Sequence, residues 1–147
     1  MPLTVFLGYK KALEINNLKF DQKLVYECKK VTFEEGKLFA DQILKDHPDV
    51  DGIFVITDLV AIGVLTYFNE NKILVPKQIK IIGFSNWFMA QVISPKLSTV
   101  DQPSYEMGTQ SFDLLLEEMI CKKESKPFIS KIVELKTAVI GRESTNN

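Results

Sequence analysis

Apolar residues in this chain form two kinds of run, and the order of these runs predicts an α/β fold. Short continuous runs such as GIFVI at residues 52–56 and IKIIGF at residues 79–84 are typical of parallel strands that are covered on both faces. Longer segments repeat apolar residues three and four positions apart, as amphipathic helices do. We therefore expect extended segments at residues 23–28, 52–56, 79–84, 97–102 and 132–140, and helices at residues 5–16, 33–47, 58–71 and 104–121.

Residues at the expected helix ends support this order. Thr32 and Glu35 have the spacing of a capping box, in which side chains satisfy free amides at a helix start. Ser104 follows Pro103 and is expected to cap the last helix. Strands separated by helices with short connections favour a mainly parallel sheet flanked by helices on both faces. The helix at residues 58–71 is apolar almost all round, so it needs a second contact surface besides the sheet.

Polar residues directly follow two consecutive buried strands. Thr57-Asp58 comes after GIFVI, and Ser85-Asn86-Trp87 comes after IKIIGF. Because ligands of parallel sheets collect at the carboxyl ends of the strands, we predict that these residues contact a ligand. Hydroxyl, carboxylate and amide groups beside an indole suit sugar hydroxyls or base edges. The alternative is that Thr57 and Asp58 only cap a helix and the later residues only shape a turn.

Composition limits the partners of the chain. Its 147 residues, 46% hydrophobic and 25% charged, suit one compact domain. The 18 basic and 19 acidic residues nearly cancel, so we expect no direct binding to DNA. The start, MPLTVFLGYKK, resembles no export signal, and no apolar run reaches the length of a membrane span, so we expect a cytoplasmic protein without membrane contact. Cys28 and Cys121 lack metal or redox spacing and are expected to be reduced.

Catalytic chemistry finds little support in the sequence. His47 is the only histidine, so a catalytic triad or a histidine-rich metal site would need substitute residues that the sequence does not offer. Asp51, Asp58 and Glu106 are conceivable acid-base groups, but no paired nucleophile, glycine-rich phosphate loop or metal-ligand spacing accompanies them. We therefore expect no enzyme, no catalytic residue, no metal and no cofactor.

Short motifs follow one another along the chain in a specific order. They are Gly8-Tyr9 with Ala12-Leu13, Thr57-Asp58, Gly83-Phe84-Ser85-Asn86, the stretch ISPKLSTVDQPSYEMG at residues 93–108, and Gly141-Arg142-Glu143-Ser144. Taken together over essentially the whole chain, these motifs resemble the LacI/GalR family of bacterial transcription regulators. Each motif is weak alone, and the specificity of the resemblance comes from their order and spacing.

The resemblance implies a fold and a division of the chain. The fold is a periplasmic-binding-protein-like (type I) subdomain, of which this chain holds an incomplete part. Residues 1–147 would form the C-terminal part of the effector-binding domain, with residues 1–100 and 130–147 in the C-terminal subdomain. Residues 101–129 would be a segment that belongs to the other subdomain in relatives. No DNA-binding domain is expected within these residues.

The resemblance also implies a function. The chain would sense a small-molecule effector, a sugar or related metabolite, and would modulate DNA binding by a helix-turn-helix domain outside these residues. The residues expected to bind the effector are Thr57, Asp58, Ser85, Asn86, Trp87 and Gln102. The alternative function is the solute-binding component of a sugar transport system, which has the same fold but normally carries an export signal.

Three positions depart from the family pattern. The resemblance implies an arginine where this chain has Val5, an acidic residue where it has Ser85 and a stacking aromatic residue where it has Val31. Valine cannot supply the charge-assisted hydrogen bonds of arginine. We therefore expect an effector that differs from a typical sugar or purine, or weakened recognition.

Two helices suggest that the chain associates with another copy. The apolar stripe at residues 105–119 would lack the cover that the other subdomain provides in relatives, and exposed apolar faces usually find a partner. The apolar surplus on the helix at residues 58–71 suggests the same. We therefore expect a homodimer.

Overall fold

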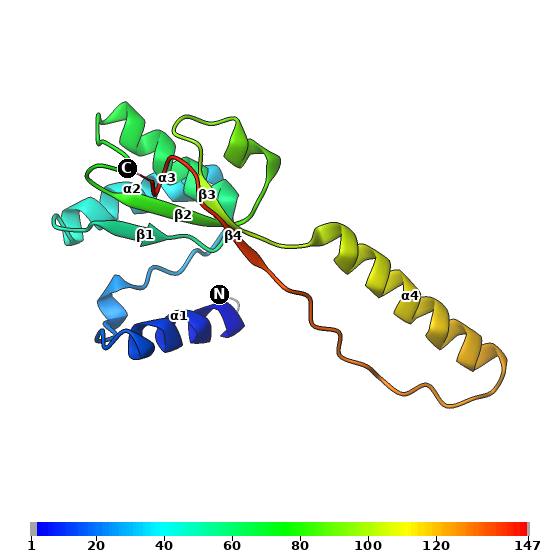
Figure 1. The fold of residues 1–147 in the computed structure, drawn as a ribbon. Helices are drawn as coiled ribbons and strands as arrows, with labels where there is room; N and C mark the ends of the chain where they lie inside the picture. The colour runs from blue at the N-terminus through cyan, green and yellow to red at the C-terminus, as the bar shows by residue number, and fades with distance from the viewer. Residues whose placement is uncertain (1–2, 147) are drawn as a thin grey trace.

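A four-stranded sheet with helices packed against it forms the body of the protein in a computed structural model that describes residues 3–146 (Figure 1). In chain order the elements are α1 (Leu3–Ile15), η1 (Gln22–Leu24), α2 (Phe33–Asp46), β1 (Gly52–Phe54), α3 (Asp58–Glu70), β2 (Lys80–Ser85), η2 (Phe88–Gln91), β3 (Ser98–Asp101), α4 (Ser104–Lys123) and β4 (Ala138–Ile140). The strands are ordered β1-β2-β3-β4. The first two pairs are parallel and β4 runs antiparallel to β3. The prediction of a mainly parallel α/β sheet is confirmed.

The core forms around α3, which lies between α2 and the sheet. Its residues from Val60 to Leu65 are buried, and Phe68 is fully buried. One side of the helix packs on β2, where Ile81 is fully buried, and the other side packs on α2. The second contact surface that the sequence predicts for this helix is therefore α2 of the same chain. The expectation that its apolar surplus serves a second copy is wrong.

Two glycines allow α2 and α3 to cross closely. A Cβ atom placed on Gly36 would collide with the Val60 carbonyl oxygen and lie 3.1 Å from the Cα atom of Gly63. A Cβ atom on Gly63 would collide in the same way with the Phe33 carbonyl oxygen. Each helix therefore presents bare backbone to the other at the crossing. This close approach explains how a short helix pair buries a continuous apolar core.

The predicted strand at residues 23–28 is not formed. Residues 22–24 make the short helix η1, and residues 25–28 belong to no strand in the described part of the chain. Tyr26 instead packs edge-on against Phe39 of α2, with 5.9 Å between ring centroids, and its hydroxyl donates to Asp46 at 3.0 Å. A strand needs a neighbouring strand for its backbone groups. Side-chain packing on α2 holds this segment in place of strand pairing.

The two faces of the sheet differ in their cover. α2 and α3 lie on one face, and Figure 1 shows α1 on the other side. On that side Phe54 packs edge-on against Phe84, with 6.4 Å between ring centroids, yet Phe54 remains 39% exposed. The prediction that the strand at residues 52–56 is covered on both faces is therefore wrong for this face. α1 packs mainly on its own following segment, through Phe6 and Phe20 at 5.8 Å.

A long arm projects from the sheet (Figure 1). It consists of α4 and residues 124–137, which return to the sheet at β4. None of the residues of α4, all of which the structure describes, is buried. The expectation that the apolar stripe at residues 105–119 lacks cover is confirmed. Two details of the prediction are wrong: Pro103 takes the cap position in place of Ser104, and the last strand is limited to Ala138–Ile140.

The glycine crossing can be tested by substitution. We expect Gly36→Ala to lower the free energy of unfolding by about 1–3 kcal/mol, because the added methyl group forces α2 away from α3. Gly108→Ala in exposed α4, where the added carbon meets no atom within 4 Å apart from its chain neighbours and the nearby backbone of its own helix, is the matched control. It should be neutral or stabilising by about 0.5–1 kcal/mol, because alanine is the better helix former. Urea unfolding measures both, and equal stability of Gly36→Ala and the wild type would contradict the close crossing.

Candidate functional site

The carboxyl end of β1 leads directly into α3 through Thr57 and Asp58. The Thr57 hydroxyl accepts a hydrogen bond from the Val60 backbone N–H at 3.3 Å and so caps the helix. Asp58, the first residue of the helix, is fully buried. Thr57 therefore caps the helix, as the alternative prediction states. The Asp58 carboxylate instead bonds groups in other parts of the chain.

Asp58, which follows β1, is bonded to the loop after β2 and to the middle of β3. Its Oδ1 accepts from the Thr99 hydroxyl of β3 at 2.7 Å, and its Oδ2 accepts from the Trp87 backbone N–H after β2 at 2.6 Å. Gly83 of β2 makes room for this carboxylate, because a Cβ atom there would collide with Oδ1. Both oxygens are thus engaged by protein donors. Asp58 supports the site from behind, and its direct contact with a ligand stays a prediction.

The backbone after β2 is in an unusual conformation. Ser85 has φ 117° and Asn86 has φ 51°, both in the left-handed region. Such conformations cost about 1–3 kcal/mol for a residue such as serine and persist only where surrounding contacts hold them. The Asn86 N–H donates to the Thr99 hydroxyl at 3.1 Å, and this bond anchors the loop to the same junction as Asp58. Strain of this kind is concentrated at binding and catalytic sites.

An open hollow of about 420 Å³ lies at this edge of the sheet. Its lining residues are Ser85, Asn86, Trp87, Phe88, Gln102, Ser104 and Met107. Four of the six predicted site residues are among them, and the bonds of Asp58 bring Thr57 and Asp58 to the adjacent strand end. Among the described residues that line the hollow, none is acidic or basic. The wall therefore combines hydroxyl and amide groups with aromatic and thioether surface.

Sequence reasoning missed three residues of this wall. Phe88 follows the predicted Trp87 directly, so its position beside a strand end was an available signal. Ser104 and Met107 come from the first turn of α4, and only the path of the chain after β3 brings them to the hollow. Val5 on α1 and Val31 before α2, two of the positions that depart from the family pattern, lie outside the lining.

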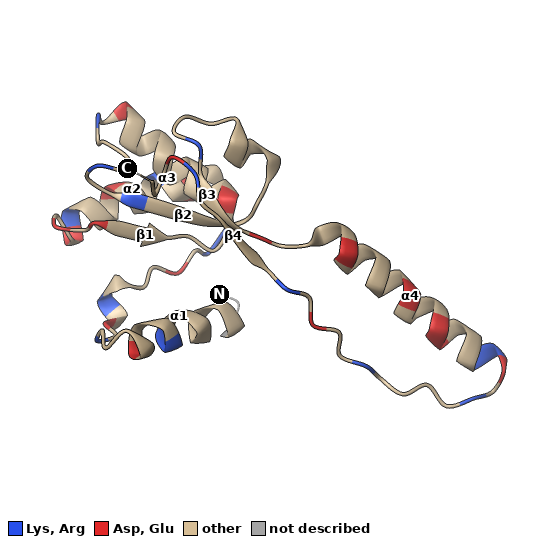
Figure 2. Cartoon of the chain, viewed as in Figure 1, with Lys and Arg blue, Asp and Glu red and all other residues tan. Residues whose placement is uncertain are grey.

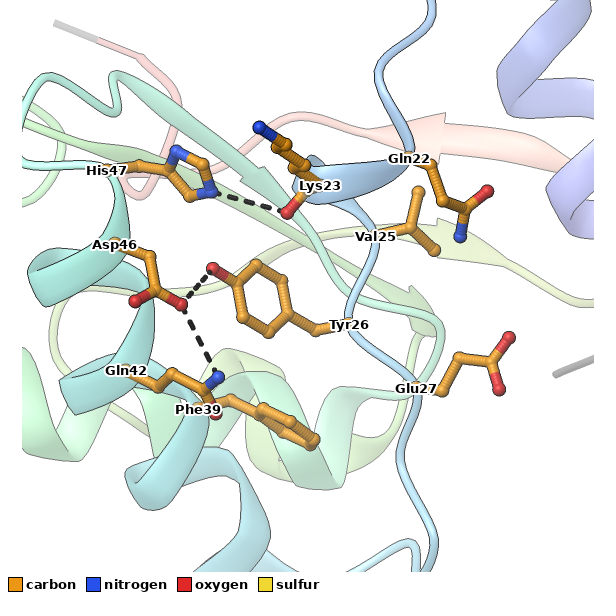
Figure 3. Close-up of a pocket in the computed structure, with 9 residues that line it drawn as sticks. All are labelled: Gln22, Lys23, Val25, Tyr26, Glu27, Phe39, Gln42, Asp46 and His47. Carbon is orange, nitrogen blue, oxygen red and sulfur yellow. Dashed lines mark hydrogen bonds between the residues drawn. The ribbon is translucent and has the colours of Figure 1, made fainter.

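A second, larger hollow of about 570 Å³ lies between residues 22–27 and the end of α2 (Figure 3). Its polar groups largely engage one another. Asp46 accepts from the Tyr26 hydroxyl at 3.0 Å and from Gln42 at 3.4 Å, and a His47 ring nitrogen lies 3.3 Å from the Lys23 carbonyl oxygen. Burial, followed by the hydrogen bond to Asp46, raises the pKa of Tyr26 to about 12.

The position of each hollow relative to the sheet indicates which one is the better candidate for a ligand-binding site. The hollow at α2 lies where the chain enters β1, at the amino-terminal side of the sheet. The smaller hollow lies at the carboxyl ends of β2 and β3, where α/β sheets bind ligands. It also contains the strained loop. We therefore take the smaller hollow as the candidate binding site.

Two other kinds of site find no support within residues 3–146. In this range no group of three or more histidine, cysteine, aspartate or glutamate side chains is placed to hold a metal ion. Over the same residues no helix combines the length and the apolar character needed to cross a membrane.

Several known proteins are similar to this chain in both sequence and fold. Residues 4–145 match a family described as a periplasmic binding protein-like domain. The HTH-type transcriptional repressor PurR of Vibrio atlanticus is 28% identical over 141 residues, which cover 93% of this chain and 40% of PurR. The crystal structure of the transcription regulator CcpA of Lactococcus lactis has a TM-score of 0.85 at 29% identity, covering 96% of this chain and 49% of that chain.

A third similar protein is a LacI family transcriptional regulator from Enterococcus faecium, solved with bound ribose. Its TM-score is 0.79 at 29% identity, with 94% of this chain and 49% of that chain covered. This chain spans about two fifths of the length of PurR and about half of each of these two solved chains. All three proteins are regulators rather than enzymes or transport components, so the transport alternative is not favoured. The resemblance seen in the sequence is thus confirmed, and the chain belongs to the periplasmic binding protein-like family, in the form shared by LacI-type transcription regulators.

Proposed function

We propose that this chain forms one wall of the effector-binding site of a LacI-type transcription regulator. The observation that carries the proposal is the Asp58 junction, which ties the start of α3 after β1 to the loop after β2 and to the middle of β3 behind a hollow. We propose Thr57, Asp58, Ser85, Asn86, Trp87 and Gln102 as the residues that form this wall or support it. Ligand binding here would modulate DNA binding by a helix-turn-helix domain.

The chemistry of the wall favours a neutral, hydroxylated effector. The Ser85 hydroxyl and the amides of Asn86 and Gln102 can exchange hydrogen bonds with hydroxyl groups. The Trp87 indole, 45% exposed, offers a flat surface for the apolar face of a sugar ring. The bound ribose of the Enterococcus faecium regulator supports this class of ligand. A neutral lining gives no charge with which to hold a phosphate group.

The arm suggests how the chain is divided. We propose that residues 1–100 and 130–147 form one subdomain and that residues 101–129 pack on the other subdomain of a complete regulator. The exposed apolar side chains of α4 support this division, because such a surface normally has a covering partner. Closure of the two subdomains around the effector would then link the site to the DNA-binding region. A cytoplasmic location stays a prediction.

A second copy is the partner that we propose for α4 in the isolated chain. Tyr105, Phe112, Leu115 and Met119 recur at helical spacing and are all exposed. Figure 2 shows charged residues at other positions along α4, so the helix is amphipathic with its apolar face uncovered. The dimer proposal now depends on α4 alone, because α2 covers α3.

The first test concerns ligand binding by the wall. We expect neutral sugars to bind the chain with a dissociation constant of about 1 mM or weaker, because one wall supplies few contacts. Saturation-transfer NMR against neutral sugars, nucleosides and sugar phosphates measures this. Gln102→Ala should weaken binding about fivefold through one lost hydrogen bond, whereas Gln110→Ala, an exposed glutamine on α4, should not. Equal binding of phosphorylated and neutral sugars, or no binding, would contradict the proposal.

The second test concerns the junction behind the wall. Asp58→Ala leaves the Thr99 hydroxyl and the Trp87 N–H without their acceptor, and we expect a loss of about 2–4 kcal/mol in the free energy of unfolding. A role limited to the helix dipole would cost only about 0.3–1 kcal/mol. Asp113→Ala on exposed α4 is the matched control and should change stability by less than about 0.5 kcal/mol. Chemical unfolding distinguishes the two roles of Asp58.

The third test concerns association. We expect light scattering after size exclusion to give the mass of a dimer at micromolar concentration. Leu115→Gln combined with Met119→Gln should return the chain to a monomer, because it removes apolar area from the centre of the α4 face. Asp113→Asn, two residues before Leu115 and already polar in the wild type, should remain dimeric. A monodisperse wild-type monomer would remove the dimer proposal.

A further inference from the structure

The Asn86 side chain, which follows β2, bonds one residue at the end of β3 and one residue after β4. Its Nδ2 donates to Asp101 Oδ1 at 2.8 Å, and its Oδ1 accepts from Arg142 Nη2 at 2.7 Å. Asp101 is the last residue of β3 and precedes the short link to α4, while Arg142 follows β4, along which the chain returns from the arm. One side chain of the proposed binding wall is therefore held by a residue at the point where β3 leads to the arm and by a residue that follows β4.

Arg142 is itself fixed to the start of β3. Its Nη1 donates to the Leu97 carbonyl oxygen at 2.8 Å, and its backbone N–H donates to the Ser98 hydroxyl at 2.7 Å. The two arms of the planar guanidinium thus reach Leu97 and Asn86 at the same time, an arrangement that a single ammonium group cannot reproduce. Because Asp101 accepts from one end of the Asn86 amide and Arg142 donates to the other, the orientation of this amide is fixed.

The amide in turn holds the strained loop. Ser85 and Asn86 are both in the left-handed region, and the neighbouring Trp87 lines the hollow. A loop that stores strain relaxes when the contacts that hold it are removed. The Asn86 side chain is one of these contacts, and the bond from its N–H to Thr99 is another.

The geometry points to Arg142 as a positioning residue that, with Asp101, couples the conformation of the Ser85-Asn86-Trp87 loop to the orientation of the arm. The coupling rests on the proposed function in one respect only, namely that a ligand uses this loop. β3 and β4 form a short antiparallel ladder in which Asp101 pairs with Ala138, and the arm leaves the sheet at that end. Reorientation of the arm at this end would move Asp101, whereas Arg142 is held at the start of β3 by Leu97 and Ser98, so the Asn86 amide could not keep both of its bonds.

Natural probes exist at both ends of this connection. Trp87 is the only tryptophan of the chain and reports on the loop. Cys121 lies in the last turns of α4 and accepts a fluorescent acceptor in a Cys28→Ala background, so that energy transfer from Trp87 reports the orientation of the arm. Both readouts are made without ligand, so their outcome does not depend on the outcome of the sugar-binding experiment.

The test compares Arg142→Gln with Lys96→Gln. Lys96 is also basic and lies at the same end of the sheet, where it pairs with Glu143 at 3.9 Å and does not contact Asn86. We expect Arg142→Gln to shift Trp87 emission to longer wavelength, to increase its quenching by acrylamide and to broaden the donor–acceptor distance distribution. Lys96→Gln should leave all three unchanged. Arg142→Lys keeps the charge and the fold but loses one of the two contacts, and it should give the same changes to a smaller extent.

A double-substitution cycle separates positioning from general stability. If Arg142 acts through Asn86, the effects of Arg142→Gln and Asn86→Ala on Trp87 quenching are not additive, because either change releases the loop. Additive effects would overturn the inference. Unchanged emission and energy transfer in both Arg142 variants, or equal changes in Lys96→Gln, would overturn it as well.

Discussion

The buried carboxylate of Asp58 is the interaction on which the rest of the site depends. A buried charge is costly unless hydrogen bonds replace its hydration, and here both oxygens accept strong bonds, at 2.6 and 2.7 Å. Its position in the first turn of α3 adds the favourable field of the helix amino terminus. The same group therefore fixes the start of α3, the loop after β2 and the middle of β3. Gly83 is required for this arrangement, because any side chain there would occupy the space of the carboxylate.

Much of this architecture could be predicted from the sequence where a local pattern and its tertiary partner agree. Continuous apolar runs gave β1 and β2, and polar residues after them located the hollow, because parallel strands place their carboxyl ends at one edge. The segment at residues 23–28 has a strand pattern but lies against α2, where Tyr26 bonds Asp46. A pattern alone cannot reveal whether a strand has a neighbour. Nor could it place Met107 of α4 in the wall, since that contact depends on the path of the chain after β3.

Other differences have equally local causes. The sheet ladder ends where β3 ends, because Gln102 and Pro103 lead into α4 and proline has no backbone N–H to continue the pairing. β4 therefore begins only at Ala138, which pairs with Asp101. The preceding residues 124–137 have no strand beside them in the described part of the chain. The glycines at positions 36 and 63 were visible in the sequence. Their meaning required the knowledge that they face each other across two helices.

The bonds of Asn86 to Asp101 and Arg142 connect the proposed binding wall to the base of the arm. A ligand that accepts a hydrogen bond from Asn86 would use the second hydrogen of Nδ2, because Asp101 takes only one, and the same amide would then join the ligand, Asp101 and Arg142. The ligand therefore shifts the balance between arm orientations only by the difference in its affinity for them. By reciprocity, whatever fixes the arm changes the affinity of the wall by the same factor. A surface that covers α4 would thus act on the hollow without touching it, through β3 and β4.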